Sequence, residues 1–502
     1  MIADVGLERP HAESRPAAVA GLSRPGHRRR RIWSAGLLPF VLLAAVRAGW
    51  FAEGDTFWQI PTGTQLLARH TIFLTDTFSW TVAARPWHPN SWLFDVLLAV
   101  AYDIAGPFGL AAFTVLLVTA LGVGVTAVAT RLAVRPLPLL VTFTLFLLPD
   151  LAWISTRPQT LSYALLPHTL LLTARALQSR GRRLVLTLLA LYLLIAVWTN
   201  LHLASLGALP AVAAGLAAVL IGHRRAWRRL VPVCGAVFGM VVLGCVSSPL
   251  GFGALSSALA TGGASHEVVI EWATLWQTSA AGVLTWLGAA IAVALGAAAW
   301  RHRPHDPLLA TSTAGAAALL LLGITAARFS PMALAAALPG VAAWASGVDW
   351  SAGRGRGRVA FYATGTAVGL LAALLLIAGL RLPDLGRPSP AAFPTTRTVD
   401  AIPAGCRVLD EYGDGGFLIL HRHADGVRVA MDGRNDVYGA ALIAHLQGLV
   451  MGRPGALAEL HRDHVGCLLL DPDRPLIRQA LAAGWRTAAH DAHRILLLSP
   501  ID

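Results

Sequence analysis

The sequence predicts a polytopic α-helical membrane protein with a small α/β domain at its C-terminal end. The chain has 502 residues, of which 55% are hydrophobic and only 13% are charged, and its mean hydropathy is +0.60. Apolar runs of about 20 residues, the length that a helix needs to cross a bilayer, recur between residues 33 and 380. After residue 380, short apolar runs alternate with helical patterns, which is typical of a domain outside the membrane. We therefore expect the lipid bilayer to surround most of the chain.

The arginines between the apolar runs predict how the spans are oriented. They gather in every second loop, for example at 131–135 and 180–183. Because cytoplasmic loops carry an excess of basic residues, this alternation predicts about eleven spans and a cytoplasmic N-terminus. The apolar segment 91–104 is short and contains acidic residues, so we expect an interfacial or half-inserted helix there. The predicted spans are 34–50, 107–130, 137–149, 159–177, 184–199, 203–221, 230–247, 281–299, 307–325, 330–347 and 359–380.

The same pattern divides the chain into regions. They are a disordered basic cytoplasmic tail at 1–32, a transmembrane domain at 33–380 with a large first extracytoplasmic loop at 51–106, a proline-rich linker at 381–398 and an extracytoplasmic α/β domain at 399–502. The strands expected in the last domain are 407–409, 417–420, 427–431, 467–470 and 495–498, and the expected helices are 438–450, 455–463 and 474–483.

Cys406 and Cys467 each begin an expected strand of this domain. If the two strands are neighbours in a parallel sheet, their first residues can lie close enough for a disulfide. If they are not, the two cysteines are reduced, buried thiols. The sequence leaves both possibilities open.

The net charge of +13 does not predict a nucleic-acid partner. The basic surplus lies in the N-terminal tail and the short loops between spans, whereas the C-terminal domain is slightly acidic. This distribution is typical of membrane topology rather than of a basic binding face. No P-loop, dinucleotide-binding glycine pattern or zinc-ligand spacing is found in the sequence.

The predicted topology gathers polar side chains in the loops on the extracytoplasmic side of the membrane. Lipid would penalise polar groups at helix ends, so their occurrence on one side predicts a shared cavity. The residues concerned are Asp55, Asp76, His88, Asp150, Arg157, Gln159, Asn200, His202, Glu267, Glu271, Trp272 and Arg328.

The acidic members of this set are candidates for catalysis. Asp55 follows the first span and suits a general base or a ligand of a divalent cation (Mg²⁺ or Mn²⁺), although it also fits a helix N-cap. Asp76 is a second candidate for either role, and its alternative is an Asx-turn in Thr75-Asp76-Thr77. Glu271 is a candidate acidic partner from a later loop.

The basic and amide members are candidates for substrate binding. Arg157 and Arg328 suit a lipid phosphate, because the planar guanidinium matches phosphate oxygens, and their alternative is snorkelling to lipid headgroups. His88 suits a phosphate or an acceptor, or a structural role in its aromatic loop. Gln159 is expected beside Arg157. Asn200 and His202 are candidate substrate contacts whose alternative is hydrogen bonding between helices.

Several short motifs resemble those of a largely uncharacterised group of bacterial multi-spanning proteins. They are Gly-Asp-Thr-Phe-Trp at 54–58, Thr-Asp-Thr-Phe-Ser at 75–79, Pro-Trp-His at 86–88, Arg-Pro-Gln at 157–159, Trp-Thr-Asn-Leu-His at 198–202, Glu-Trp at 271–272, Arg-Phe at 328–329, Gly-Gly-Phe-Leu at 415–418 and Asp-Gly-Arg-Asn-Asp-Val-Tyr at 432–438. That group is assigned to the GT-C glycosyltransferase superfamily. In the outer-domain motif, Arg434 and Asp436 are expected to form a pair in a strand-end turn with a structural or acceptor-facing role.

The resemblance implies a transferase of the cytoplasmic (inner) membrane. Such an enzyme moves a hexosyl or pentosyl group from a polyprenyl-phosphate-linked donor to an extracytoplasmic acceptor, which is a glycan, a lipid or a protein. One alternative is a transporter or flippase of a lipid-linked saccharide, but the inverted repeats and paired broken helices typical of transporters are not evident. The other is a non-catalytic assembly partner with the same fold, against which the intact Asp55 and Asp76 argue.

Overall fold

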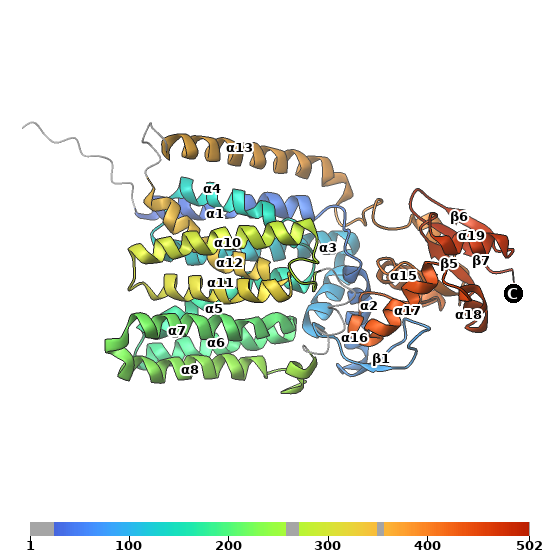
Figure 1. The fold of residues 1–502 in the computed structure, drawn as a ribbon, viewed down its shortest axis with the longest axis horizontal. Helices are drawn as coiled ribbons and strands as arrows, with labels where there is room; N and C mark the ends of the chain where they lie inside the picture. The colour runs from blue at the N-terminus through green and yellow to red at the C-terminus, as the bar shows by residue number, and fades with distance from the viewer. Residues whose placement is uncertain (1–24, 258–270, 349–355, 501–502) are drawn as a thin grey trace, which may run out of the picture.

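The computed structural model describes residues 25–257, 271–348 and 356–500 of the chain, and these form a long helical bundle with an α/β domain at one end (Figure 1). A helix coincides with each predicted span. The bundle helices are α1 (Pro25–Arg47), α3 (Trp92–Ala129), α4 (Pro136–Asp150), α5 (Pro158–Gln178), α6 (Gly181–Leu201), α7 (Ala208–Gly222), α8 (Trp227–Cys245), α10 (Ala280–His302), α11 (Pro307–Thr325), α12 (Phe329–Gly347) and α13 (Arg356–Arg381).

Eight helical segments within the described ranges are long and apolar enough to cross a membrane. The segments containing α1, α4 and α5 are not among them, so the predicted count of about eleven spans is not confirmed. α4 has only 15 residues, and α1 begins with a run of arginines. The multi-spanning, mostly helical character of the chain is nevertheless clear.

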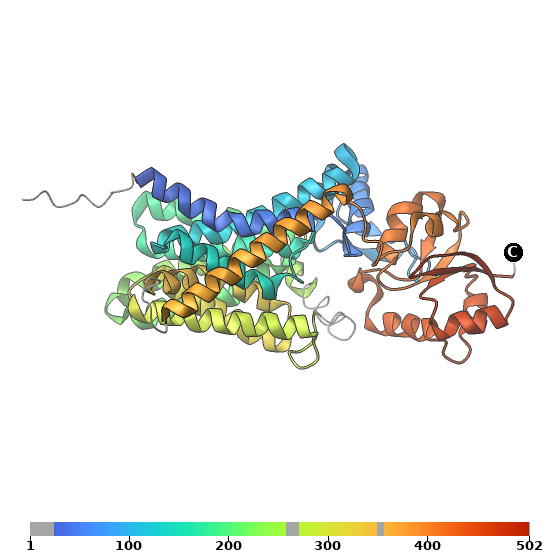
Figure 2. The same ribbon diagram turned by 90° about the horizontal axis from the view of Figure 1, so that it is seen from above.

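The bundle has a buried centre and a peripheral helix. α12 is rich in alanine, and 83% of the residues in its most apolar 18-residue stretch are buried inside the protein. In α13 and the residues that follow it, only 11% of the corresponding stretch is buried. α13 crosses the outside of the bundle next to α1, as the view from above shows (Figure 2). The exposed apolar side chains of α13 are those expected of a lipid-facing helix.

One predicted boundary differs from the structure. α1 begins at Pro25, so residues 25–32 of the expected disordered tail are helical, while residues 1–24 lie outside the described part of the chain. Segment 91–104 is helical from Trp92, as expected, and forms the first part of α3, while its interfacial position stays a prediction. The helix is broken at Ala105 and Gly106, where Gly106 has a φ of 54° that favours glycine.

The first loop contains its own small elements. α2 (Asp55–Arg69) follows α1, and β1 (Leu74–Thr75) pairs antiparallel with β2 (Pro86–Trp87). Between these strands, the chain runs along the edge of the C-terminal sheet. Val429 N donates to Phe78 O at 3.1 Å, and Trp80 N donates to Val429 O at 3.1 Å.

The C-terminal domain is built on a five-stranded sheet in the order β4-β3-β5-β7-β6. β3 (Arg407–Asp410) is parallel to β4 (Arg428–Val429) and β5 (Cys467–Leu470), and β7 (Ile495–Leu498) is antiparallel to β5 and β6 (Arg486–His490). The domain's helices are α14 (Thr396–Asp400), α15 (Gly415–Arg422), α16 (Asn435–Tyr438), α17 (Ala440–Val450), α18 (Ala456–Arg462) and α19 (Pro475–Ala482).

One expected strand is wrong. Residues 417–420 lie in α15, because a short apolar run fits a buried helix as well as a buried strand. The predicted strands around β3, β4, β5 and β7 are present. β6 was not expected, since its side chains are mostly exposed and show no apolar pattern.

The parallel pairing of β3 and β5 decides the question of the two cysteines. Val408 is the register partner of Cys467. The Cα atoms of Cys406 and Cys467 are 6.3 Å apart, and the two side chains form a disulfide. The bridge therefore joins the residue before β3 to the first residue of the adjacent strand β5.

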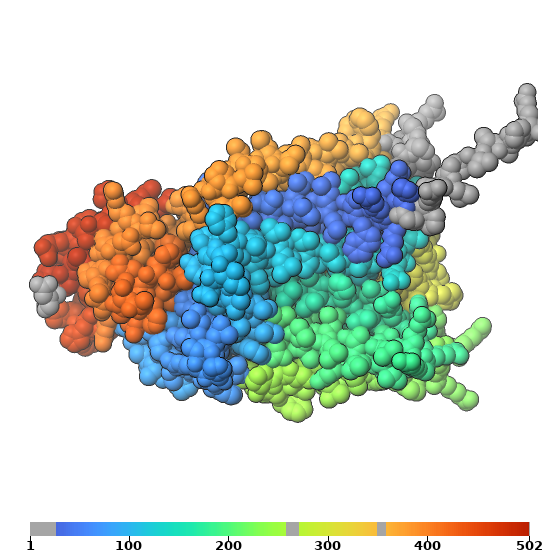
Figure 3. All heavy atoms as spheres, turned by 180° about the vertical axis from the view of Figure 1, so that it is seen from behind, coloured from blue at the N-terminus to red at the C-terminus, as the bar shows by residue number. Residues whose placement is uncertain are grey.

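The first loop and the C-terminal domain share one hydrophobic core. Phe57 of α2 packs edge-to-face on Phe393 and Phe417, with ring centroids 5.0 and 5.3 Å away. The space-filling view from behind shows the first loop, in blue, pressed against the orange and red C-terminal domain (Figure 3). The domain is thus packed directly on the loop that carries Asp55.

Candidate functional site

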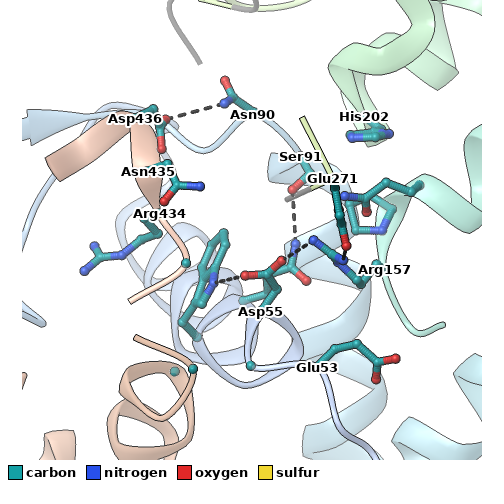
Figure 4. A pocket seen from close by; sticks show the side chains of 18 of the residues that line it. Glu53, Asp55, Asn90, Ser91, Arg157, His202, Glu271, Arg434, Asn435 and Asp436 are labelled. Atoms are coloured by element: carbon teal, nitrogen blue, oxygen red, sulfur yellow. Dashed lines mark hydrogen bonds and ion pairs between the residues drawn. The ribbon is translucent and has the colours of Figure 1, made fainter. Parts of the chain in front are cut away.

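A cavity of about 400 Å³ lies where the bundle, the first loop and the C-terminal domain meet (Figure 4). It is lined by Ala52, Glu53, Gly54, Asp55, Trp58, Gln59, Trp87, Asn90, Ser91, Arg157, Pro158, Gln159, His202, Glu271, Trp272, Arg328, Tyr412, Gly413, Gly416, Gly433, Arg434, Asn435 and Asp436. Six of the nine candidate residues for catalysis and substrate binding belong to this lining: Asp55, Arg157, Gln159, His202, Glu271 and Arg328.

Asp55 is the first residue of α2 and points into the cavity. Gly54 occupies the N-cap position of this helix, so Asp55 is not an N-cap residue. Its Oδ1 accepts a hydrogen bond from Trp58 Nε1 at 3.1 Å, and its Oδ2 accepts one from Arg157 Nη2 at 2.7 Å. The carboxylate is therefore held at both oxygens.

Arg157 joins two carboxylates that are far apart in the sequence. It immediately precedes α5, and its Nη1 donates to Glu271 Oε1 at 2.6 Å while Nη2 binds Asp55. Burial would raise the pKa of Glu271, but Arg157 and Arg328 outweigh it and hold that pKa below its usual value. Burial likewise opposes charge on Arg157, yet the two carboxylates raise its pKa. Arg157 and Glu271 are therefore both ionised at neutral pH.

Arg328 lies beside the triad of Asp55, Arg157 and Glu271, but its guanidinium stacks on an aromatic ring. Its guanidinium carbon lies 4.1 Å from the ring centroid of Trp272, and its backbone N–H donates to Glu271 O at 3.0 Å. Within the described ranges, Arg328 forms no ion pair with a carboxylate. It thus presents a stacked guanidinium to the cavity, with its charge available to an anionic group.

Further polar atoms on the cavity wall are buried without a hydrogen-bond partner among the residues that the structure describes. They are Gln59 Oε1, Arg157 Nε and Gln159 Oε1. An unpaired buried polar atom costs free energy, so these three atoms are suited to form hydrogen bonds with a polar ligand or water in the cavity. His202 differs, because its Nδ1 lies 2.8 Å from Ser162 Oγ, which also accepts from Trp198 Nε1.

Three predicted site residues do not line the cavity. Asn200 connects helices, as its alternative proposed: its Oδ1 accepts from Trp92 Nε1 at 2.9 Å and its Nδ2 donates to Ser247 O at 2.7 Å. His88 lies in the first loop with its ring against Phe73, at a centroid separation of 6.5 Å. Glu267, another residue of the predicted set, falls outside the described ranges.

Asp76 is the third, and it forms a separate buried cluster. Its Oδ1 accepts from Phe78 N at 3.4 Å, which is an Asx-turn, and its Oδ2 accepts from Ser79 N and Ser79 Oγ. Its Oδ1 also accepts from Arg434 Nη1 at 2.7 Å. The expectation that Arg434 pairs with Asp436 is wrong, since Arg434 binds Asp76 and Asp432 instead. Asp76 is therefore placed to hold the loop, not to face a substrate in the cavity.

The expected divalent cation does not fit this arrangement. Asp55 and Asp76 belong to different clusters, and each already binds a guanidinium. Between Asp55 and Glu271, the position of a bridging cation is taken by Arg157. Among the residues described, no group of three or more histidine, cysteine, aspartate or glutamate side chains is arranged to hold a metal ion.

The 432–438 motif is predicted from the sequence to have a structural or acceptor-facing role, but the sequence does not predict that the C-terminal domain forms part of the cavity wall. Tyr412, Gly413 and Gly416 follow β3, and the segment Gly433–Asp436 follows β4. Loops at the carboxyl ends of parallel strands are where α/β domains bind ligands. The signal available in the sequence was the glycine-rich run Gly413-Asp414-Gly415-Gly416 directly after a predicted strand.

No family model and no curated protein matches this sequence. Solved structures do match in fold. The Archaeoglobus fulgidus oligosaccharyltransferase in the apo form aligns with a TM-score of 0.56 and 12% identity over 89% of this chain and 70% of that one. ArnT from Cupriavidus metallidurans bound to undecaprenyl phosphate aligns with a TM-score of 0.54 and 13% identity over 95% of this chain and 98% of that one.

The same ArnT in the apo state gives a TM-score of 0.53 and 13% identity over 91% and 95% of the two chains. Oligosaccharyltransferase and ArnT are GT-C glycosyltransferases. The fold of this chain therefore resembles the GT-C superfamily, as the sequence motifs predicted. At this level of identity the likeness concerns the fold alone.

Proposed function

We propose that this protein transfers a sugar from a polyprenyl-phosphate-linked donor to an acceptor hydroxyl, in the cavity that contains Asp55. The observation that carries the proposal is a carboxylate held at both oxygens on the wall of a polar cavity, with two arginines beside it, at the end of a GT-C-like bundle. One of the similar structures, ArnT, was solved with undecaprenyl phosphate bound, which supports a lipid phosphate as the donor's leaving group.

Asp55 is proposed as the general base. The acceptor oxygen forms a bond to the anomeric carbon while the bond from that carbon to the phosphate oxygen breaks. The polyprenyl phosphate leaves with the bonding electron pair, and the hydroxyl proton passes to Asp55. Since Arg157 and Trp58 both bind this carboxylate, its orientation is fixed before the acceptor arrives.

Arg328 is proposed to bind the donor phosphate. Its charge has no carboxylate partner within the described ranges, and the stacking on Trp272 keeps the guanidinium plane in a defined orientation. A guanidinium can bind two phosphate oxygens at once and can stabilise the charge that develops on the leaving group. No step in this scheme passes through a metal ion, because the carboxylates of the cavity are already bridged by Arg157.

The cavity is proposed to face the extracytoplasmic side of the inner membrane. The support is the arginine-rich loops, such as 131–135 and 180–183, which belong to the opposite end of the bundle from the C-terminal domain. With this orientation a polyprenyl chain can stay in the bilayer while its phosphate enters the cavity, and a water-borne acceptor can approach from the C-terminal domain.

The experiment compares Asp55→Asn with Asp103→Asn, a change at an exposed carboxylate of α3. Purified protein in nanodiscs is incubated with synthetic polyprenyl-phosphate hexose and pentose donors and with envelope extracts as acceptors, and released polyprenyl phosphate is measured. Loss of a general base costs about 10²–10⁴-fold in rate, which is the effect expected for Asp55→Asn. Asp103→Asn should match the parent. Full activity of folded Asp55→Asn would refute the proposal.

A further inference from the structure

A fully buried charged cluster lies beside the cavity, where the C-terminal domain packs on the first loop. The side chains of Arg434, Asp432 and Asp76 all have 0% exposure. Arg434 donates from Nε to Asp432 Oδ1 at 2.8 Å, from Nη2 to Asp432 Oδ2 at 2.6 Å and from Nη1 to Asp76 Oδ1 at 2.7 Å. Tyr438 completes the cluster by donating to Asp432 Oδ2 at 2.6 Å.

This cluster connects two regions that are far apart in the sequence. Asp76 belongs to the first loop, whereas the other members follow β4 in the C-terminal domain. The rings of Phe78 and Trp87, also from the first loop, lie 4.9 and 5.1 Å from the guanidinium carbon of Arg434. Moving Arg434 away from its two carboxylates would leave uncompensated buried charges, which is strongly unfavourable. The cluster therefore fixes the position of Arg434 and of the residues next to it.

The residue before Arg434 touches the proposed base. Gly433 lies so close to α2 that a Cβ atom there would overlap Asp55 Oδ1 and would lie 3.0 Å from Trp58 Nε1. Figure 4 shows the side chain of Arg434 pointing away from the cavity, on the opposite side of its backbone from Asp55. The backbone at 433–434 therefore has the buried ion pairs on one side and the carboxylate on the other.

We infer that the Gly433–Arg434 segment is a positioning element for Asp55. The ion pairs of Arg434 with Asp76 and Asp432 hold the segment in place, and the Gly433 backbone limits where the Asp55 carboxylate can lie. Arg434 touches no substrate in this scheme and acts through its neighbour. The inference rests on the proposed function, and it makes the C-terminal domain part of the catalytic site.

Gly433→Ala tests this inference, because a small displacement of the Asp55 carboxylate should lower the rate measurably. Misplacing a catalytic group by about 1 Å costs on the order of 10²-fold in rate. In Gly433→Ala the new methyl group would meet Asp55 at the end of its side chain, which moves more easily than backbone. Gly433 has no positive φ that would strain an alanine for another reason. We therefore expect the variant to fold and its carboxylate to shift.

The matched control is Gly448→Ala in α17 of the same domain. A Cβ there meets only the flexible side chain of Arg453, at 3.3 Å. Turnover and KM for the polyprenyl-phosphate donor are measured for both variants, normalised to the folded fraction. Gly433→Ala should lose about 10²-fold in kcat with the donor KM changed less than about threefold, and Gly448→Ala should match the parent. A kcat for Gly433→Ala within threefold of the parent would overturn the inference.

A double-mutant cycle separates positioning from a merely structural effect. If Gly433 acts through Asp55, Gly433→Ala should cause no further loss in the residual rate of Asp55→Asn, because the carboxylate it displaces is already gone. A purely structural effect would lower both backgrounds by the same factor, and that result would overturn the inference. Failure of the proposed function gives a different result, since Asp55→Asn alone would then be active.

Arg434→Lys tests the other side of the segment. Lysine keeps the charge but lacks the planar fork with which three guanidinium nitrogens bind both oxygens of Asp432 and one of Asp76. We expect a loss of kcat that again disappears in the Asp55→Asn background, while donor KM stays within about threefold of the parent. A folded Arg434→Lys protein with parental kcat would show that the cluster does not set the position of the base.

Discussion

The triad of Asp55, Arg157 and Glu271 allows a quantitative prediction. Replacing Arg157 by glutamine removes hydrogen bonds of 2.7 Å to Asp55 and 2.6 Å to Glu271, and leaves two carboxylates facing each other. Removing one partner of a buried ion pair costs about 3–5 kcal/mol. Here the side chains of Arg157 and Glu271 are 20% and 26% exposed, so solvent screens part of the effect. We expect Arg157→Gln to lower the free energy of unfolding by about 2–4 kcal/mol.

The same change should alter the pH dependence of stability. Arg157 helps to hold the pKa of Glu271 below its usual value, so the stabilisation from this carboxylate is complete above its unfolded-state pKa of about 4.3. It is lost as the pH falls through the lower folded-state value. Without Arg157, burial and the nearby Asp55 both favour protonation, so the loss should begin at a higher pH in Arg157→Gln than in the parent.

Denaturant titration of the purified protein across pH 4–8 measures both effects. Arg453→Gln is the control, because Arg453 pairs with Glu459 on the surface of the C-terminal domain and its loss should cost less than about 1 kcal/mol. Adding Glu271→Gln to Arg157→Gln should recover part of the stability by removing one unpaired charge. This prediction is wrong if Arg157→Gln is as stable as the control, or if adding Glu271→Gln lowers the stability further.

Three further predictions concern the donor, the cation and the disulfide. Arg328→Lys keeps the charge but loses the planar fork, so it should raise the KM for the lipid donor by about tenfold or more and leave the acceptor KM nearly unchanged; equal effects would mean that Arg328 only shapes the cavity. EDTA should leave transfer unchanged, because Arg157 occupies the place of a bridging cation; activity restored only by Mg²⁺ or Mn²⁺ would contradict this. Alkylation followed by intact-mass measurement should modify Cys406 and Cys467 only after reduction, whereas the free thiols Cys234 and Cys245 should react in the denatured, non-reduced protein.

The helical bundle could be predicted from the sequence because bilayer physics constrains it strongly. A span must be long, apolar and internally hydrogen-bonded, and each predicted span from 34–50 to 359–380 coincides with a helix. The C-terminal domain is less constrained. Its short apolar runs fit strands or buried helices, and residues 417–420 form the helix α15 because they pack inside a core shared with the first loop.

The candidate site could be predicted where residues stand at helix ends. Asp55, Arg157, Glu271 and Arg328 meet because the topology brings those ends to one side of the bundle. Asp76 could not be separated from Asp55 in this way, since its partner Arg434 is 358 residues away in the sequence. For the same reason, the 432–438 motif could be recognised but not placed beside Asp55. Long-range packing between the first loop and the C-terminal domain leaves no periodic signal in the sequence.

The proposed function requires a polyprenyl phosphate to bind in the Asp55 cavity as part of a sugar donor. The most direct measurement is an experimental structure of the protein in a lipid nanodisc with a polyprenyl-phosphate analogue. We expect density for the phosphate within hydrogen-bonding distance of Arg328, in the same cavity as Asp55 and Arg157, with the lipid chain leading into the bilayer. A phosphate bound at the arginine-rich opposite end of the bundle, with the Asp55 cavity free of it, would show that the proposed function is wrong.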